Sequence, residues 1–251
     1  MARCLSVAFL LGSDRLRSAV VLPFVMTGLL ATGCAQSRVA TRTDKWERVP
    51  SSARVVLMTP DIELAELTAG GVLEPNAEWT ELAKIHVVDA LQGEVGARNA
   101  RLVSYQPPAN DSARAYQHNQ LIKLHAVVGS SVLLHHYGAL KLPNKDGKFD
   151  WTLGDGAKVL REDAEADYAL FIFVRDSYAS AGRKAAMVGV AILSVGRVII
   201  PGGVHTAFAS LVDLKTGDLV WFNRLVDTQA DLRDVDPARS AIKKLAADLP
   251  L

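Results

Sequence analysis

Short apolar runs alternate with amphipathic stretches from residue 54 onward, and this pattern predicts a domain of strands and helices. Arg54–Met58 is a nearly continuous apolar run that ends at Thr59-Pro60, as expected of a buried strand. Residues 62–74 form two short apolar segments around Gly70-Gly71, which predicts a hairpin. A further strand is expected over 101–105.

The clearest strand signals lie in the second half of the chain. Residues 167–178 contain Leu170–Val174, which is apolar at every position and should therefore lie in the centre of a sheet. Two strands, 204–214 and 219–226, are separated by Lys215-Thr216-Gly217-Asp218, which is typical of a tight hairpin turn. The residues of 205–212 alternate between the two faces of the first of these strands.

Four segments have helical periodicity. The first runs from a cap at Asn76 to about Gly96, and the second from Asp111 or Ser112 to about Tyr137. A short helix is expected over 157–166, and Asp236-Pro237 should begin the last one, with Pro at its first position. The predicted buried faces are Leu82, Ile85, Val88, Leu91 and Val95 in the first; Leu121, Leu124, Val128 and Val132 in the second; and Ala238, Ile242, Leu245 and Leu249 in the last.

These elements predict a single α/β (α+β) domain over 53–251, with a mixed, largely antiparallel sheet and helices packed on it. Residues 140–156 are rich in turn formers, and Phe149 and Trp151 are expected to tuck under this loop.

Residues 179–203 do not fit this pattern. The segment is apolar all round, is bracketed by Arg183, Lys184 and Arg197, and is too short to span a membrane. One alternative is a helix or hairpin buried against the sheet; the other is an apolar arm that meets a membrane or another copy of the protein. In the second case the interaction surface would comprise Met187, Val190, Ile192, Leu193, Val198 and Ile199.

The N-terminus has the organisation of a secretory signal. Arg15 and Arg17 precede an uncharged, mostly apolar stretch over 18–30. Its length of about thirteen residues is short of the roughly twenty that a bilayer requires, so a membrane-spanning anchor is the weaker alternative.

The sequence Ala31-Thr32-Gly33-Cys34 resembles the lipobox of bacterial lipoproteins. The resemblance implies a signal peptide over 1–33, cleavage between Gly33 and Cys34, and acylation of Cys34. Ala35 follows where an inner-membrane retention signal would usually have Asp, which implies the periplasmic face of the outer membrane. The alternative is an ordinary signal peptide with an incidental cysteine. Residues 34–52 are polar and aperiodic and are expected to form a flexible tether, with Trp46 packed on the edge of the domain rather than on a partner.

Composition narrows the chemistry. The 251 residues carry a net charge of +1, which gives no reason to expect a nucleic-acid partner. The two cysteines are Cys4 and Cys34, so removal of the signal would leave one and would exclude a disulfide framework, a cysteine-rich zinc site and a C-x-x-C motif. We expect no cofactor.

No residue type in the chain falls into a recognisable catalytic or metal-binding frame. His118, His125, His135 and His136 share one predicted helix, but their spacing is not that of a metal motif. Ser180, Ser194 and Ser210 lack a Gly-x-Ser-x-Gly frame. Asp213 and Asp218 are interpreted as turn formers, and Glu63 and Glu66 as surface residues that could pair with Arg54 or lysines. We therefore predict neither a catalytic nor a metal site.

Two stretches carry a family resemblance. They are Ala166–Leu170 (ADYAL) and Ala209–Trp221 (ASLVDLKTGDLVW), and they are similar to periplasmic assembly lipoproteins, namely the outer-membrane penicillin-binding-protein activators and the curli-secretion lipoproteins of the CsgG type. The resemblance implies a mixed sheet with packed helices and an envelope setting, and it transfers no catalytic residue. The chain lacks the long strand-forming segments that a pore needs.

These observations predict a lipid-anchored, non-enzymatic interaction or assembly module, held at the membrane through its lipid. Its partner would be a periplasmic or envelope protein or a second copy of itself. The alternative is an envelope protein that binds or hydrolyses a small molecule or glycan, with its pocket near residues 140–156.

Overall fold

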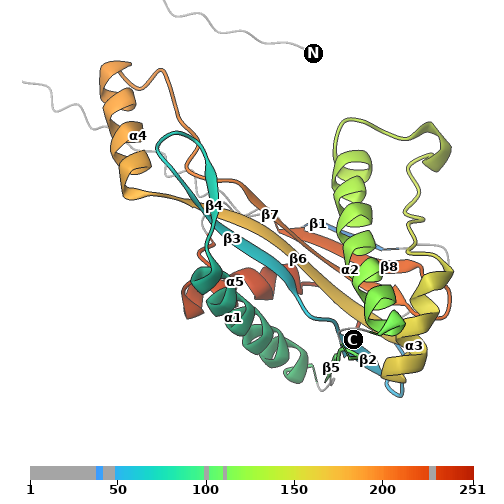
Figure 1. The fold of residues 1–251 in the computed structure, drawn as a ribbon. Helices are drawn as coiled ribbons and strands as arrows, with labels where there is room; N and C mark the ends of the chain where they lie inside the picture. The colour runs from blue at the N-terminus through green and yellow to red at the C-terminus, as the bar shows by residue number, and fades with distance from the viewer. Residues whose placement is uncertain (1–37, 42–48, 99–101, 110–111, 226–229) are drawn as a thin grey trace, which may run out of the picture. The chain divides into compact units, whose positions relative to one another are not determined.

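The computed structural model describes residues 38–41, 49–98, 102–109, 112–225 and 230–251, and residues 35–251 form one compact unit. Its centre is a mixed sheet, shown in Figure 1, whose described strands follow the order β1-β8-β7-β6-β2-β5, with β3 beside the second half of β6 and β4 beside β3. Strands β2, β3 and β5 join by parallel pairings with β6 or β2, and the others pair antiparallel. The mixed sheet with packed helices confirms the predicted fold class. The strands are β1 (Arg38–Thr41), β2 (Val55–Leu57), β3 (Asp61–Leu67), β4 (Leu73–Pro75), β5 (Leu102–Ser104), β6 (Tyr168–Ala179), β7 (His205–Asp213) and β8 (Leu219–Leu225).

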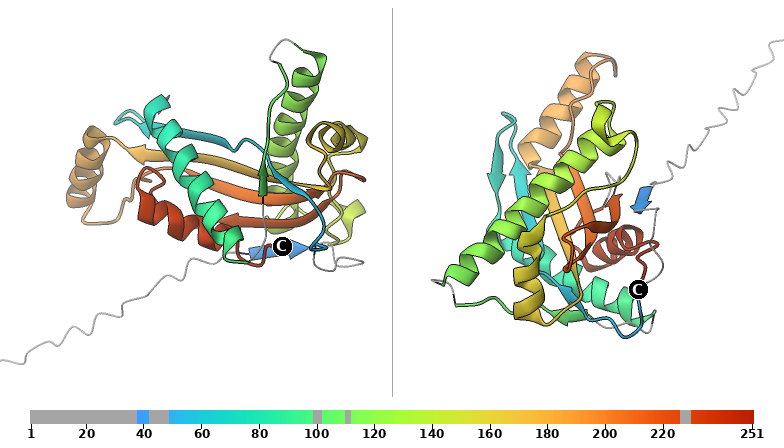
Figure 2. Two further views of the ribbon diagram at one scale, coloured as in Figure 1. Left: turned by 90° about the horizontal axis from the view of Figure 1, so that it is seen from below. Right: turned by 90° about the vertical axis from the view of Figure 1, so that its right-hand side faces the viewer.

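Strand β6 is central, as its continuous apolar run predicts. Leu170 and Ile172 face a core formed with helices α1 (Ala77–Gly96) and α5 (Val235–Leu245). Phe171 and Phe173 face the opposite core, which includes residues of α2 (Ala113–Val132), α3 (Lys158–Ala164) and the 149–157 loop. The two views of Figure 2 show these helices around the sheet. Both faces of β6 are therefore buried, and period-2 alternation assigns each side chain to one of two cores.

The remaining α-helix, α4 (Ala181–Leu193), contributes to neither core. None of its residues is buried, and it lies past the end of β6 and covers neither face of the sheet (Figure 1). The predicted alternative in which 179–203 packs on the sheet as a buried helix or hairpin is therefore wrong.

The first helix has the predicted cap, because the Asn76 side chain accepts a hydrogen bond from Trp79 N at 3.0 Å. Its predicted face is partly wrong. Leu82 and Ile85 are exposed, and burial falls instead on Ala83, Val87 and Ala90, together with the predicted Leu91 and Val95. Small alanines permit close approach to β3 and α5, and that close approach turns the bulkier residues outward.

Ser112 caps α2, and its side chain accepts from Ala115 N. Leu121 and Val132 are buried as predicted, whereas Leu124 is exposed, and His118, His125 and Gly129 complete the buried face. The last helix buries the predicted Ala238, Ile242 and Leu245, whereas the predicted Leu249 is buried beyond the end of the helix. The helix begins at Val235 after an Asp234 cap, so Pro237 is not its first residue.

Part of the predicted tether is structured. Residues 38–41 form the edge strand β1 beside β8, and Val49 is buried, its backbone N–H donating to Pro250 O at 3.0 Å. The expectation of a flexible tether through 34–52 does not hold at these residues. Trp46, Asp111 and the predicted signal peptide with Cys34 lie outside the described residues.

Helix α2 packs tightly against the sheet at Gly129. A Cβ atom at this position would lie 2.0 Å from Phe208 Cε2, and the Phe208 ring is stacked between Phe173 and Phe222 with centroid distances of 4.6 and 5.3 Å. The ring is buried among other rings and has no room to move aside.

We predict that Gly129→Ala lowers the free energy of unfolding by about 1–3 kcal/mol, because the added methyl overpacks a rigid core. The matched control is Gly93→Ala on α1, where a Cβ would meet nothing within 4 Å. This change should raise stability by up to about 1 kcal/mol through helix propensity. Urea unfolding followed by circular dichroism measures both, and equal effects of the two substitutions would contradict the close packing of α2.

Candidate functional site

The most unusual surface of the protein is the arm, which we define as residues 181–204: α4 and the segment that returns to β7. Ser180 caps the helix by accepting a hydrogen bond from Arg183 N at 3.1 Å. The Arg183 guanidinium donates from two nitrogens to Pro201 O, at 3.1 and 2.8 Å, and from a third to Thr68 O at 3.4 Å. The return segment and the β3–β4 turn are thereby tied to the first turn of α4, so the arm has a braced base.

Apolar side chains of the arm are exposed to solvent. Leu193, Val195 and Ile199 are each 86% exposed, and Ile192 is 70% exposed. Burying an aliphatic side chain of this size is worth about 1.5–3 kcal/mol, so a domain that leaves several unburied at one place is not using them for its own stability. Several large apolar side chains exposed on one segment are typical of a contact site.

The predicted interaction residues divide into two groups. Ile192, Leu193, Val198 and Ile199 are exposed on the arm, whereas Met187 and Val190 are half-buried. Sequence reasoning missed Val188, Val195 and Val204 on the arm, and Val72 and Leu73 on the adjoining β3–β4 hairpin, all of which are exposed. Their apolar character was visible in the sequence, but their exposure depends on the arm leaving the sheet.

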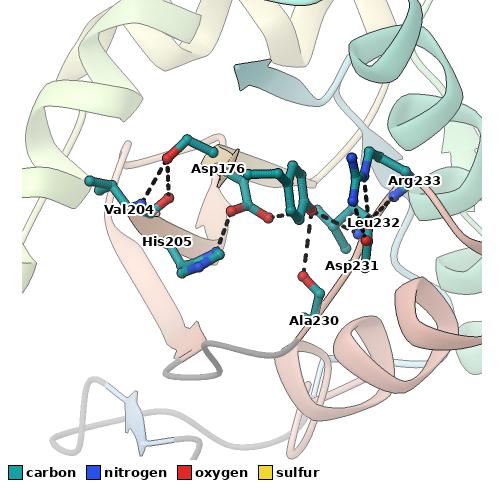
Figure 3. A network of polar contacts seen from close by, with 9 residues as sticks. Asp176, Val204, His205, Ala230, Asp231, Leu232 and Arg233 are labelled. Carbon is teal, nitrogen blue, oxygen red and sulfur yellow. Dashed lines mark hydrogen bonds and ion pairs between the residues drawn. The ribbon is translucent and has the colours of Figure 1, made fainter. Parts of the chain in front are cut away.

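A polar network joins the base of the arm to the segment that precedes α5 (Figure 3). Asp176, near the end of β6, is buried and contacts His205 Nδ1 across the β6–β7 pair. Its other carboxylate oxygen accepts from Tyr178 Oη at 2.6 Å, and Tyr178 Oη in turn accepts from Leu232 N at 3.0 Å. Burial and the Asp176 carboxylate raise the pKa of Tyr178, which keeps the phenol protonated as a donor.

Arg233 closes the same region. Its guanidinium donates to both carboxylate oxygens of Asp231, at 2.8 and 2.6 Å, and lies 4.0 Å from the Tyr178 ring centroid and 4.6 Å from that of Trp79. The hydrogen bonds from Arg233 lower the pKa of Asp231. The adjoining cavity, lined in part by Asp176 and His205, measures about 20 Å³, which is too small for a substrate. The network fixes the end of the sheet from which the arm projects.

The two buried histidines of α2 serve the core. His125 Nε2 lies 2.7 Å from Ser210 Oγ, and its ring stacks on Phe171. Burial lowers the pKa of His125 to about 3, so the ring is neutral. A serine beside a neutral histidine has the composition of a nucleophile and its base, but both residues are buried and a substrate cannot reach them.

His118 bridges two other elements. Its Nδ1 lies 2.6 Å from Tyr105 Oη and its Nε2 lies 2.9 Å from Asp163 Oδ2. Burial lowers the pKa of His118, and the Asp163 carboxylate opposes that shift. The imidazole thus connects the segment after β5 to α3.

The other residues weighed from the sequence are dispersed. Asp213 accepts from Lys215 N at 2.8 Å and so shapes the β7–β8 turn. Arg54 pairs with Glu165 rather than with Glu63 or Glu66, and Ser194 lies in the turn after α4, where it accepts from Val198 N. Within the described ranges, no three His, Cys, Asp or Glu side chains gather where they could hold a metal ion.

The 140–156 loop borders a basic pocket of about 200 Å³. Its lining includes His135, His136, Lys141, Lys145, Lys148 and Trp151. The Trp151 side chain is buried, and its indole N–H has no hydrogen-bond partner among the described residues. Lys145 Nζ lies 4.7 Å from the Trp151 ring centroid and pairs with Asp150 at 2.9 Å. Burial, together with Lys141, lowers the pKa of His136.

Among the helices that the structure describes, none combines the length and the hydropathy of a membrane span. No protein-family model and no curated protein matches the chain.

Two solved structures, both dodecamers of PelC from Paraburkholderia phytofirmans, show weak similarity. The first, a variant with a single leucine-to-methionine substitution, is 12% identical, with 86% of this chain and 97% of that chain covered and a TM-score of 0.36. The second is 14% identical, with 84% and 94% covered and the same TM-score of 0.36. Similarity at this level indicates neither a shared family nor a shared function.

The pKa of His125 predicts how stability depends on pH. The folded value of about 3 lies below the ordinary value of 6.5, so the unfolded chain takes up the proton first as pH falls. The contribution of His125 to stability is complete above pH 6.5 and is lost towards pH 3, at about 1.4 kcal/mol per pH unit. His125→Gln should remove this part of the acid sensitivity in urea unfolding measured between about pH 7.5 and 4.5.

The matched control is Ser210→Ala, which removes the hydrogen-bond partner and retains the imidazole. It should lower stability at every pH and keep the acid slope of the wild-type protein. An unchanged slope in His125→Gln would contradict the assignment.

Proposed function

We propose that the protein is a lipid-anchored, non-enzymatic interaction or assembly module at the periplasmic face of the outer membrane. The observation that supports the proposal is the exposure of apolar side chains on the arm. Such side chains contribute hydrophobic free energy only when a binding partner or a membrane buries them. The lipobox-like Ala31–Cys34 would supply the anchor, and the resemblance of residues 166–170 and 209–221 to periplasmic assembly lipoproteins supports the setting.

The arrangement of titratable groups agrees with a role in binding. The His125–Ser210 and His118–Asp163 pairs link elements of the core, and the Asp176–His205 pair borders a cavity that is too small for a substrate. Each pair therefore has a structural role, and a catalytic role is not needed to explain why these residues lie together.

Two variants of the full chain test the proposal in cells. Cys34→Ser should move the protein out of the outer-membrane fraction, because acyl chains on Cys34 provide the anchor. Ile192→Glu combined with Ile199→Glu should leave the urea midpoint unchanged, since both side chains are exposed, and should abolish the contacts that the arm makes. Membrane fractionation and formaldehyde crosslinking followed by recovery of the tagged chain measure the two effects.

We expect the wild-type chain to be recovered with an envelope protein or a second copy. Recovery of the tagged chain alone would contradict the interaction role. A Cys34→Ser chain that also carries Ile192→Glu and Ile199→Glu and still stays with the outer membrane would contradict the lipid anchor.

The basic pocket supports a second candidate function, the binding of an anionic small molecule or acidic glycan. Lys141, Lys145 and Lys148 line the pocket and supply positive charge, and Trp151 supplies an aromatic side chain to its lining. An aromatic wall beside charged donors suits the apolar face and carboxylate of an acidic sugar.

Lys148→Gln should weaken binding of an oligogalacturonate probe several-fold in calorimetric titration, because it removes one of the cations that line the pocket. Lys243→Gln, which removes an exposed lysine of α5 outside the pocket, serves as the control and should leave affinity unchanged. Equal loss in both variants would indicate a general charge effect, and no binding by the wild-type chain would reject this candidate.

A further inference from the structure

We propose that the arm lies against an anionic lipid surface, so that the domain contacts a membrane directly as well as through its N-terminus. The inference rests on the proposed function, in which the arm is a contact surface. It specifies that the arm contacts lipid. Three observations favour lipid over a protein partner or a second copy.

The first is the distribution of apolar side chains. Val188 and Ile192 lie one turn apart on α4, and Leu193 lies about a hundred degrees away around the axis. Val195 and Ile199 extend the exposed apolar side chains beyond the end of the helix into the return segment. A protein groove buries one stripe of a helix. Apolar side chains spread over several sides of a projecting tip can instead enter the headgroup/acyl boundary of a bilayer, to a depth of about 5–10 Å. With 13 residues, α4 is about 20 Å long and cannot cross a hydrocarbon core of about 30 Å, so it would lie at the interface.

The second is charge. The chain contains no Asp or Glu between Asp176 and Asp213, while Lys184 and Arg197 are exposed on the arm and Arg183 braces its base. Anionic headgroups attract such a segment. Two copies packed arm to arm would instead bring like charges together, which opposes self-association at this surface.

The third is the direction of the chain. The register places Arg38 beside Arg224 and Arg224 beside Phe208, and β1 runs in the same direction as β7, away from the arm. Arg38 is therefore the residue of β1 nearest to the arm end of the sheet. Four residues of extended chain reach at most about 14 Å, so acyl chains on Cys34 would hold β1 close to the headgroups. An anchor this short would keep the arm close to the membrane that holds the acyl chains.

A fluorescent reporter on the arm tests the inference. We would introduce Leu193→Cys into the full chain carrying Cys4→Ser, label the thiol with nitrobenzoxadiazole, and reconstitute the protein into phosphatidylethanolamine–phosphatidylglycerol vesicles or into phosphatidylcholine vesicles. The matched control is Lys215→Cys, an exposed position in the β7–β8 turn at the far end of β7.

We expect a several-fold, blue-shifted rise in emission at position 193 in the anionic vesicles, a smaller rise in phosphatidylcholine, and quenching by a nitroxide on the acyl chains. The reporter at position 215 should not respond. Emission at 193 that matches the control in both kinds of vesicle would overturn the proposal. So would a rise that needs no vesicles and grows with protein concentration, because it would identify a second copy as the occupant.

The chain with neither introduced cysteine separates this outcome from failure of the lipid anchor. An acylated Cys34 has no free thiol, so this chain should take up no dye. Dye incorporation would show that the anchor prediction fails, and Leu193→Cys combined with Cys34→Ser would then report on the arm alone.

Discussion

Burial of β6 on both faces is the constraint on which the rest of the structure depends. Leu170 and Ile172 require a core on one face, and Phe171 and Phe173 require another on the opposite face, so helices must cover both. Once α1 and α5 occupy one side and α2 and α3 the other, no face remains for the residues that connect β6 to β7. Antiparallel neighbours need only a short turn, yet residues 181–204 intervene between them. The arm projects beyond the end of the sheet because helices already cover both faces. Its apolar side chains are therefore exposed to solvent.

The same two-layer burial decides what the histidines and serines do. His125 and Ser210 come together because α2 passes close to β7, with Gly129 over Phe208 one turn further along the helix. Their hydrogen bond satisfies two polar groups that would otherwise be buried without partners. Burial of the ring, and not this bond, lowers the pKa of His125 and keeps the imidazole neutral near pH 7. A pair that is chemically suited to catalysis thus acts as a polar link between helix and sheet. Asp176 is a similar polar link at the arm end of the sheet. It contacts His205 of β7 and accepts a hydrogen bond from Tyr178, whose hydroxyl in turn accepts from Leu232 N in the segment before α5.

Local patterns in the sequence predicted the elements of the fold well and their tertiary relations less well. Strand β6, the β7–β8 hairpin and the Asn76 cap follow from signals that adjacent residues carry, and the structure has them where expected. The buried face of α1 was misassigned because the helix packs closely on its neighbours through the small Ala83 and Ala90, and the larger Leu82 and Ile85 face solvent. How closely a helix can pack depends on the surface it meets, which the local sequence does not reveal. Strand β1 was missed because four residues at an edge carry no periodic signal of their own. The Asp176–His205 contact was also beyond reach, since the two residues meet only once the register of β6 and β7 is known.

The edge strand and the arm together constrain how an anchored domain could sit. A long flexible tether would let the domain turn freely above a membrane, and no surface would then face the lipid for long. If Cys34 carries the proposed lipid anchor, a domain held at β1, four residues later, would sample far fewer orientations, because so short a segment reaches at most about 14 Å. Since β1 runs away from the arm end of the sheet, the first residue of that strand and the arm lie toward the same end of the sheet. Under these conditions even a weak interfacial helix is effective, because the anchor raises its local concentration at the membrane as a linker does for a second binding module. Attachment at two points would give the domain a fixed orientation and would leave the β7–β8 turn, at the opposite end of β7, pointing away from the lipid.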